Sequence, residues 1–125
     1  MGDFEIRSNT VTNRLYIKLN GFFREIDIAP TIDALTAETE KLTKDFDIVM
    51  DISKFMPGSP KAAEALREGG KLVKERGRRR AVRVTGGLVT GLMQFKRLLG
   101  GVFDEDETVR YASSTDEADK ILDDW

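Results

Sequence analysis

The chain has no cysteine and no histidine among its 125 residues. Without cysteine it can form no disulfide and carry out no thiol chemistry. Without histidine it lacks the commonest general base and the commonest metal ligand of proteins. These two absences argue against ordinary enzyme chemistry, and we expect a protein that is not an enzyme and that uses no metal and no cofactor.

Long apolar runs and a large excess of either charge are also absent. No apolar stretch approaches the roughly 20 residues that a membrane span needs, and the first residues lack the basic start and apolar core of a signal peptide. The net charge of −2 argues against a dedicated nucleic-acid binder. With 40% apolar residues, the chain can bury one full core. We therefore expect a single cytoplasmic domain over residues 1–125, without a nucleic-acid partner and without a membrane-spanning segment.

Apolar periodicity predicts strands that alternate with helices. Alternating runs at 4–7 and 15–19, the second ended by Gly21, predict a hairpin, and the continuous apolar run at 46–52 predicts a buried central strand. Further strands are expected at 81–85 and 108–112, and helices from about Asp27, at 59–76, at 88–99 and at 115–124. The prediction is an α/β domain of order ββαβαβαβα, with a five-stranded, mostly parallel sheet and an antiparallel first edge strand.

Capping residues mark the ends of two predicted helices. Ser59 precedes Pro60 at the start of the second helix, as an N-cap precedes a first-turn proline. Ser114 and Glu117 have the spacing of a capping box at the start of the last helix. Adjacent glycines inside the second helix predict close packing of that helix on the sheet.

Aromatic and apolar residues gather at the predicted carboxyl ends of two strands. Phe22 and Phe23 follow the second strand, and Phe55 and Met56 follow the third. In open α/β sheets, ligands and partners bind at these ends. The side chains could either pack into the core or form a surface for a protein or a small ligand.

The predicted helix at 88–99 is apolar on more than one face. The acidic segment at 104–107 and the last helix could cover the excess, or that face could serve a homodimer or a lipid-like ligand bound between this helix and the sheet. A basic cluster precedes it and could be a solvated helix end and strand entry or a site for an anionic partner. The cluster consists of Lys71, Lys74, Arg76, Arg78, Arg79, Arg80 and Arg83.

Three segments, taken in order, resemble the STAS domain, the fold of bacterial anti-sigma-factor antagonists. The pattern Gly-x-x-x-Glu-Ile-Asp at 21–27 is similar to the family's entry into its first helix. Asp-Ile-Ser at 51–53 followed by Phe-Met at 55–56 resembles the family's Asp-Leu-Ser…Phe-Met segment, and residues 109–118 resemble its closing strand and capped helix. The resemblance implies a bacterial regulatory module that binds a protein, either an anti-sigma factor or a related regulator.

The family's switch loop, in which a partner kinase phosphorylates a serine, differs here. The family has Asp-Ser-Ser-Gly after Phe-Met, whereas this chain has Pro-Gly-Ser-Pro at 57–60. Ser59 matches the second serine, so the resemblance makes it a candidate phosphosite, but a capping role alone would also explain a serine there.

The sequence therefore favours a protein-interaction module, with a carrier or sensor of an apolar small molecule, bound between helix 88–99 and the sheet, as the alternative. The predicted partner-binding residues are Phe55, Met56, Gly58, Ser59, Lys61, Phe22 and Phe23.

Overall fold

The computed structural model of the protein describes residues 2–86 and 107–125. Within these ranges the chain forms five strands, one 3-10 helix and three α-helices. In chain order they are β1 (Asp3–Asn9), β2 (Arg14–Phe23), η1 (Glu25–Asp27), α1 (Ile28–Thr39), β3 (Phe46–Pro57), α2 (Pro60–Glu75), β4 (Arg78–Val84), β5 (Val109–Ala112) and α4 (Thr115–Asp124).

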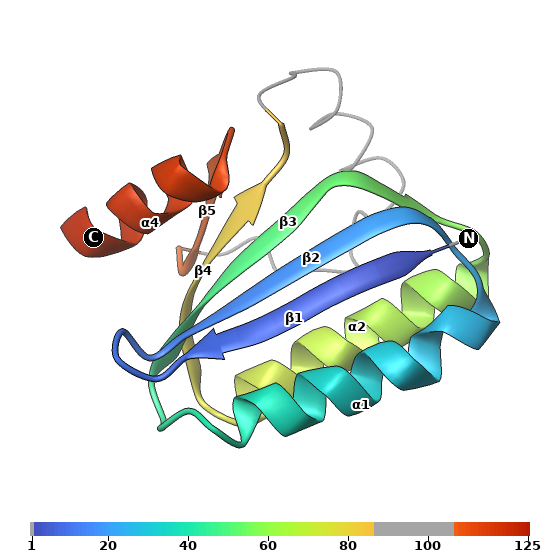
Figure 1. The fold of residues 1–125 in the computed structure, drawn as a ribbon, viewed down its shortest axis with the longest axis horizontal. Coiled ribbons are helices and arrows are strands. Elements are labelled where there is room, and N and C mark those ends of the chain that lie inside the picture. The colour runs from blue at the N-terminus through green and yellow to red at the C-terminus, as the bar shows by residue number, and fades with distance from the viewer. Residues whose placement is uncertain (1, 87–106) are drawn as a thin grey trace.

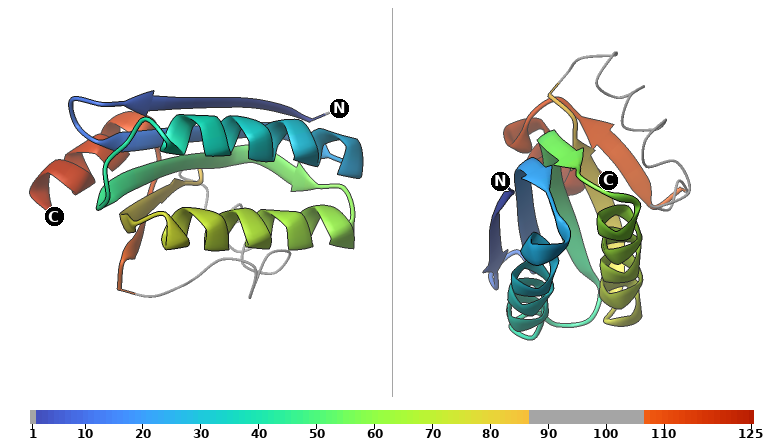
Figure 2. Two further views of the ribbon diagram at one scale, coloured as in Figure 1. Left: turned by 90° about the horizontal axis from the view of Figure 1, so that it is seen from below. Right: turned by 90° about the vertical axis from the view of Figure 1, so that its right-hand side faces the viewer.

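The five strands form one sheet in the order β1-β2-β3-β4-β5. β1 runs antiparallel to β2, and every other neighbouring pair is parallel. Helices α1 and α2 lie side by side along one face of the sheet, and α4 covers the other face near β4 and β5 (Figures 1 and 2). None of the helices within residues 2–86 and 107–125 is long and apolar enough to cross a membrane.

The α/β class, the five strands and the antiparallel first edge strand agree with the sequence prediction. The helix count and the element order do not. Three α-helices appear in the described ranges instead of four, and β5 is the next described element after β4. The third of the four predicted helices, at 88–99, lies outside the described residues, as do residues 104–106 of the acidic segment.

The prediction that Gly21 ends the second strand was wrong. β2 continues to Phe23, and β3 continues to Pro57, because residues 20–23 pair with residues 54–57. The pairing register shifts between Lys18 and Asn20, and Gly21 takes a φ of 79°. Between the pairs that Lys18 and Asn20 form with β3, β2 has one residue and β3 has two, so the extra residue belongs to β3, and neither strand ends at this β-bulge.

Asp27 was expected to cap the first helix, and its side chain makes no such hydrogen bond. Its carboxylate instead accepts a hydrogen bond from the backbone N–H of Arg24 (2.9 Å), which closes the 3-10 turn η1. The backbone carbonyl of Asp27 accepts a hydrogen bond from the Thr31 hydroxyl (2.7 Å). α1 therefore follows directly from η1 and positions the loop after β2.

The larger core lies between the sheet and the helices α1 and α2. Buried side chains of β2, β3 and β4 pack against Leu35 of α1 and Val73 of α2. Gly69 lets α2 approach α1, since a Cβ there would lie 3.2 Å from Cδ1 of Ile32. Gly69 therefore permits close packing against α1, whereas the sequence predicted close packing of the glycine pair on the sheet. The segment after Ser59 does lie along the sheet (Figure 2).

The smaller core lies beneath α4, where Val49, Val82 and Val84 of the sheet pack against Ala118 and Leu122. Polar groups bind α4 at the edge of this core. The guanidinium of Arg14 pairs with Asp119 (3.1 Å) and Asp123 (2.6 Å). Burial raises the pKa of Tyr16, and the hydrogen bond from its hydroxyl to Asp119 (2.7 Å) raises it further.

Asp47, at the start of β3, explains part of the basic cluster. Its carboxylate is buried and accepts two hydrogen bonds from Arg79 (3.3 and 3.0 Å) and two from Arg80 (3.2 and 2.9 Å). Burial alone would raise the pKa of Asp47, but the hydrogen bonds and charges of the two arginines outweigh it and lower the pKa. These two arginines therefore neutralise an internal charge and are not simply solvated.

Candidate functional site

The predicted partner-binding residues lie together at the carboxyl ends of β2 and β3 and at the start of α2. Two backbone features hold these segments together. The register of the parallel pair places Gly21 beside Phe55 and Phe22 beside Met56. The amide of Gly58 then donates a hydrogen bond to the carbonyl of Phe23 (2.6 Å). Figure 1 shows this end of the molecule on the right, away from the β1–β2 turn.

The four aromatic and apolar residues of the two strand ends divide between core and surface. Phe22 is 49% exposed and Met56 is 44% exposed. Phe23 is 1% exposed and packs edge-to-face on half-buried Phe55, with ring centroids 5.4 Å apart. Both outcomes that the sequence left open therefore occur. Phe23 and Phe55 pack into the core, and Phe22 and Met56 lie at the surface. The expectation that Phe23 contacts a partner is corrected, because its ring has almost no accessible surface.

Gly58 is required by the close approach of two backbones. A Cβ at this position would lie 2.2 Å from the carbonyl oxygen of Phe23 and 2.8 Å from Cε1 of Phe22. Any side chain would push the start of α2 away from the end of β2. Gly58 therefore fixes the distance between the exposed ring of Phe22 and the first turn of α2.

Ser59 is the N-cap of α2, as its position before Pro60 predicted. Its backbone is extended (φ −162°), and its hydroxyl oxygen accepts a hydrogen bond from the amide of Ala62 (3.1 Å). The side chain of Lys61, in the first turn, is exposed. The front of α2 thus presents a half-buried hydroxyl and an exposed cation beside the apolar strand ends.

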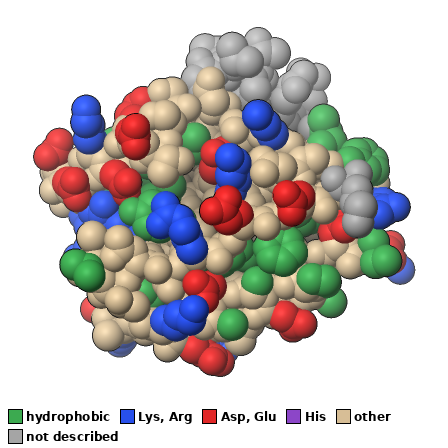
Figure 3. Space-filling view, viewed as in Figure 1, with side chains coloured by type: hydrophobic (Ala, Val, Ile, Leu, Met, Phe, Trp, Pro, Cys, Tyr) green, Lys and Arg blue, Asp and Glu red, His purple; other side chains and the backbone are tan. Residues whose placement is uncertain are grey.

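Ile26, in η1, is an apolar residue of this surface that the sequence analysis did not select. It is 73% exposed. In the sequence analysis, Glu-Ile-Asp at 25–27 was used only as part of a helix entry. The missed signal is an isoleucine between two acidic residues in a short turn, which is a position where an apolar side chain is hard to bury. Figure 3 shows apolar side chains at the end of the molecule where Figure 1 places η1 and the strand ends.

The chemistry that this region offers is that of binding. Its exposed charged residues are Arg24, Glu25, Lys54 and Lys61, placed around apolar side chains. Among the residues that the structure describes, no group of three acids could hold a metal ion. Exposed apolar side chains thus lie among exposed charged ones, a combination that also occurs at protein–protein interfaces.

Comparison with known proteins identifies the fold. No protein-family model matches the sequence, and no curated protein matches it. A solved structure described as the Bacillus cell fate determinant SpoIIAA in the phosphorylated form superposes with a TM-score of 0.59 and 12% sequence identity, over 96% of this chain and 99% of that one. The resemblance drawn from the three sequence segments is thereby confirmed at the level of structure, and the chain has the STAS-like fold of SpoIIAA.

Proposed function

We propose that the protein is a bacterial, cytoplasmic regulatory module that binds another protein through one surface. This contact surface consists of Phe22, Ile26, Met56, Ser59 and Lys61. The observation that carries the proposal is the pair of Phe22 and Met56, which stay about half exposed beside each other while the adjacent Phe23 and Phe55 pack together. Exposed apolar groups with a charged rim mark interaction sites on proteins.

The contact surface is held in place before any partner binds. Backbone hydrogen bonds join β2 to β3, and the Gly58–Phe23 hydrogen bond ties both strands to α2. A surface that is already ordered loses little conformational entropy on binding, so more of its contact energy appears as affinity. The family resemblance supplies the partner class, an anti-sigma factor or a related regulatory protein, and the fold shared with SpoIIAA supports it.

The double variant Phe22→Ser/Met56→Ser tests the contact surface. Exposed anchors of this kind contribute about 2 kcal/mol each to binding, so we expect loss of both to lower the affinity for the partner by roughly a thousandfold. The measurement is capture of a specific partner from the native host, identified by mass spectrometry, followed by titration with the purified partner.

The matched control for this test is Val11→Ser. Val11 is 92% exposed in the β1–β2 turn, at the opposite end of β2. It should leave both partner capture and the unfolding transition unchanged. Equal affinity of the partner for the double variant and for the wild type would overturn the proposed surface.

Substitutions of Ser59 separate a capping role from a phosphorylation switch. Ser59→Ala removes the acceptor for the Ala62 amide, so the free energy of unfolding should fall by about 1 kcal/mol while partner capture remains. Ser59→Asp keeps an N-cap oxygen and places a negative charge at the helix N-terminus, where it is favourable.

We expect Ser59→Asp to fold as stably as the wild type and to lose partner capture, because the new charge lies within the contact surface. Urea titration and partner titration of both variants measure the two effects separately. If Ser59→Asp captured the partner as fully as the wild type, a phosphorylation switch at Ser59 would be contradicted. The proposal for the other residues of the contact surface would still stand.

A further inference from the structure

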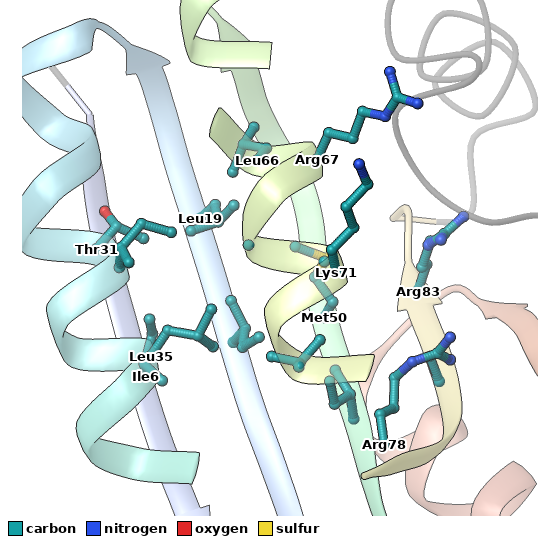
Figure 4. A pocket seen from close by; sticks show the side chains of 17 residues that line it. Ile6, Leu19, Thr31, Leu35, Met50, Leu66, Arg67, Lys71, Arg78 and Arg83 are labelled. Atoms are coloured by element: carbon teal, nitrogen blue, oxygen red, sulfur yellow. The ribbon is translucent and has the colours of Figure 1, made fainter. Parts of the chain in front are cut away.

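A partly open cavity of about 180 Å³ lies between α1, α2 and the sheet. Figure 4 shows apolar lining side chains between α1, α2 and the strands, and the lining arginines and lysine on the side of α2 that faces β4. Most of the lining is apolar, and it includes Ile17, Ile48 and Met50 from the strands, Ile32 and Leu35 from α1, and Leu66 and Val73 from α2.

The size of this cavity is sufficient for a small apolar group. Protein interiors contain few voids larger than a water molecule, and a dry apolar cavity of roughly 150 Å³ is enough to bind a benzene-sized molecule. Gly69 and Gly70 lie side by side in its α2 wall, where they contribute no side chains. The middle of this wall is therefore formed by helix backbone, which Ile32 approaches closely at Gly69.

Cations line one side of the cavity. Arg67 and Lys71 belong to α2, and Arg78 and Arg83 belong to β4, while no Asp or Glu is among the described residues of the lining. The charged ends of Arg67 and Lys71 extend from α2 on the side of β4 (Figure 4). Their ion pairs with Glu64 (4.0 Å) and Glu68 (3.7 Å) are exposed, and such pairs are weak.

We propose that this cavity binds a single-chain anionic amphiphile. Its apolar chain would lie among Ile32, Leu35 and Met50, and its head group would meet Arg67 and Lys71. An apolar interior with cations at one rim and no carboxylates is complementary to such a molecule. The site does not include the contact surface.

Calorimetric titration of the full chain with decanoate, decyl phosphate and decylamine tests the proposal. We expect saturable one-to-one binding of at least one of the two anions, with decylamine bound at least about tenfold more weakly. The tighter anion indicates whether a carboxylate or a phosphate head is preferred. Absence of saturable binding by both anions, or equal binding of the amine, would overturn the proposal.

Two variants locate the bound anion. Lys71→Glu should weaken its binding by about fivefold to tenfold, whereas Lys120→Glu, the same charge change on an exposed residue of α4, should not alter it. Ile32→Phe should fill the cavity and abolish binding, with circular dichroism confirming the fold. Binding that is unaffected by both Lys71→Glu and a folded Ile32→Phe protein would place the ligand elsewhere and refute the site.

Discussion

Replacement of Asp47 by alanine is expected to lower the free energy of unfolding by about 3 kcal/mol. Asp47 is 3% exposed, and its carboxylate holds Arg79 and Arg80 against the sheet. Its loss leaves Arg80, whose side chain is 15% exposed, without its main counter-charge. Arg79 is half exposed and can turn to water, which keeps the cost near the lower end of the range for broken buried pairs. Urea unfolding measures the change.

The control for Asp47→Ala is Asp123→Ala. Asp123 also pairs with an arginine, at 2.6 Å, but its side chain is 65% exposed. Exposed pairs contribute about 1 kcal/mol or less, so this variant should unfold close to the wild type. If the two variants lowered the free energy of unfolding by similar amounts, burial of the Asp47 ion pairs would not increase their contribution to stability.

The stabilisation by Asp47 should depend on pH in the acid range. The pKa of the Asp47 carboxyl is lower in the folded state than in the unfolded chain, so this carboxyl loses its proton more readily when the protein is folded. The resulting stabilisation is fully present above the unfolded pKa, which is about 3.9, and is lost as the pH falls through the folded pKa. The stability difference between wild type and Asp47→Asn should therefore be constant near neutral pH and shrink below about pH 4.

Gly58→Ala is expected to lower the free energy of unfolding by about 2 to 3 kcal/mol and to weaken partner binding as well. The added Cβ would meet the carbonyl oxygen of Phe23 at 2.2 Å, and backbone atoms cannot turn aside as a side chain can. Separation of the two segments would also stretch the Gly58–Phe23 hydrogen bond. Thermal unfolding and partner titration measure the two effects.

Gly69→Ala provides the matched comparison for Gly58→Ala. Its Cβ would lie 3.2 Å from Cδ1 of Ile32, the end of a flexible side chain, and alanine is favoured over glycine inside a helix by about 1 kcal/mol. We expect a change in stability within about 1 kcal/mol of zero. A Gly58→Ala protein as stable as Gly69→Ala would mean that the strand ends and α2 are not in close backbone contact.

The elements best predicted from the sequence are those with local signals. The last helix has the predicted bounds, and Ser114 accepts a hydrogen bond from the amide of Glu117 (3.2 Å), as half of a capping box does. The carboxylate of Glu117 instead accepts from Ser113, so the second half of the predicted box is not formed. Ser59 likewise marks the start of α2 correctly.

The features that escaped prediction depend on pairing between distant segments. β3 extends to Pro57 because the end of β2 lies beside it, and no local pattern around Phe55 carries that information. Asp47 and Arg80 are 33 residues apart, and only the parallel register of β3 and β4 brings them together. The same pairing decides the surface: Phe22 and Phe23 are adjacent and chemically identical, and Phe23 continues the core-facing side of β2 after Leu19 because β2 extends past Gly21.

The position of Trp125, the chain's single tryptophan, makes the smaller core observable by itself. Its ring lies 4.0 Å from the guanidinium carbon of Arg110 and 5.3 Å from that of Arg80, and its carbonyl accepts a hydrogen bond from Arg80 (2.8 Å). Detachment of α4 would hydrate this indole and shift its fluorescence emission to longer wavelength, while α1 and α2 would contribute no tryptophan signal. An emission change that precedes the loss of helical dichroism would thus report local opening at one side of the sheet before the whole domain unfolds.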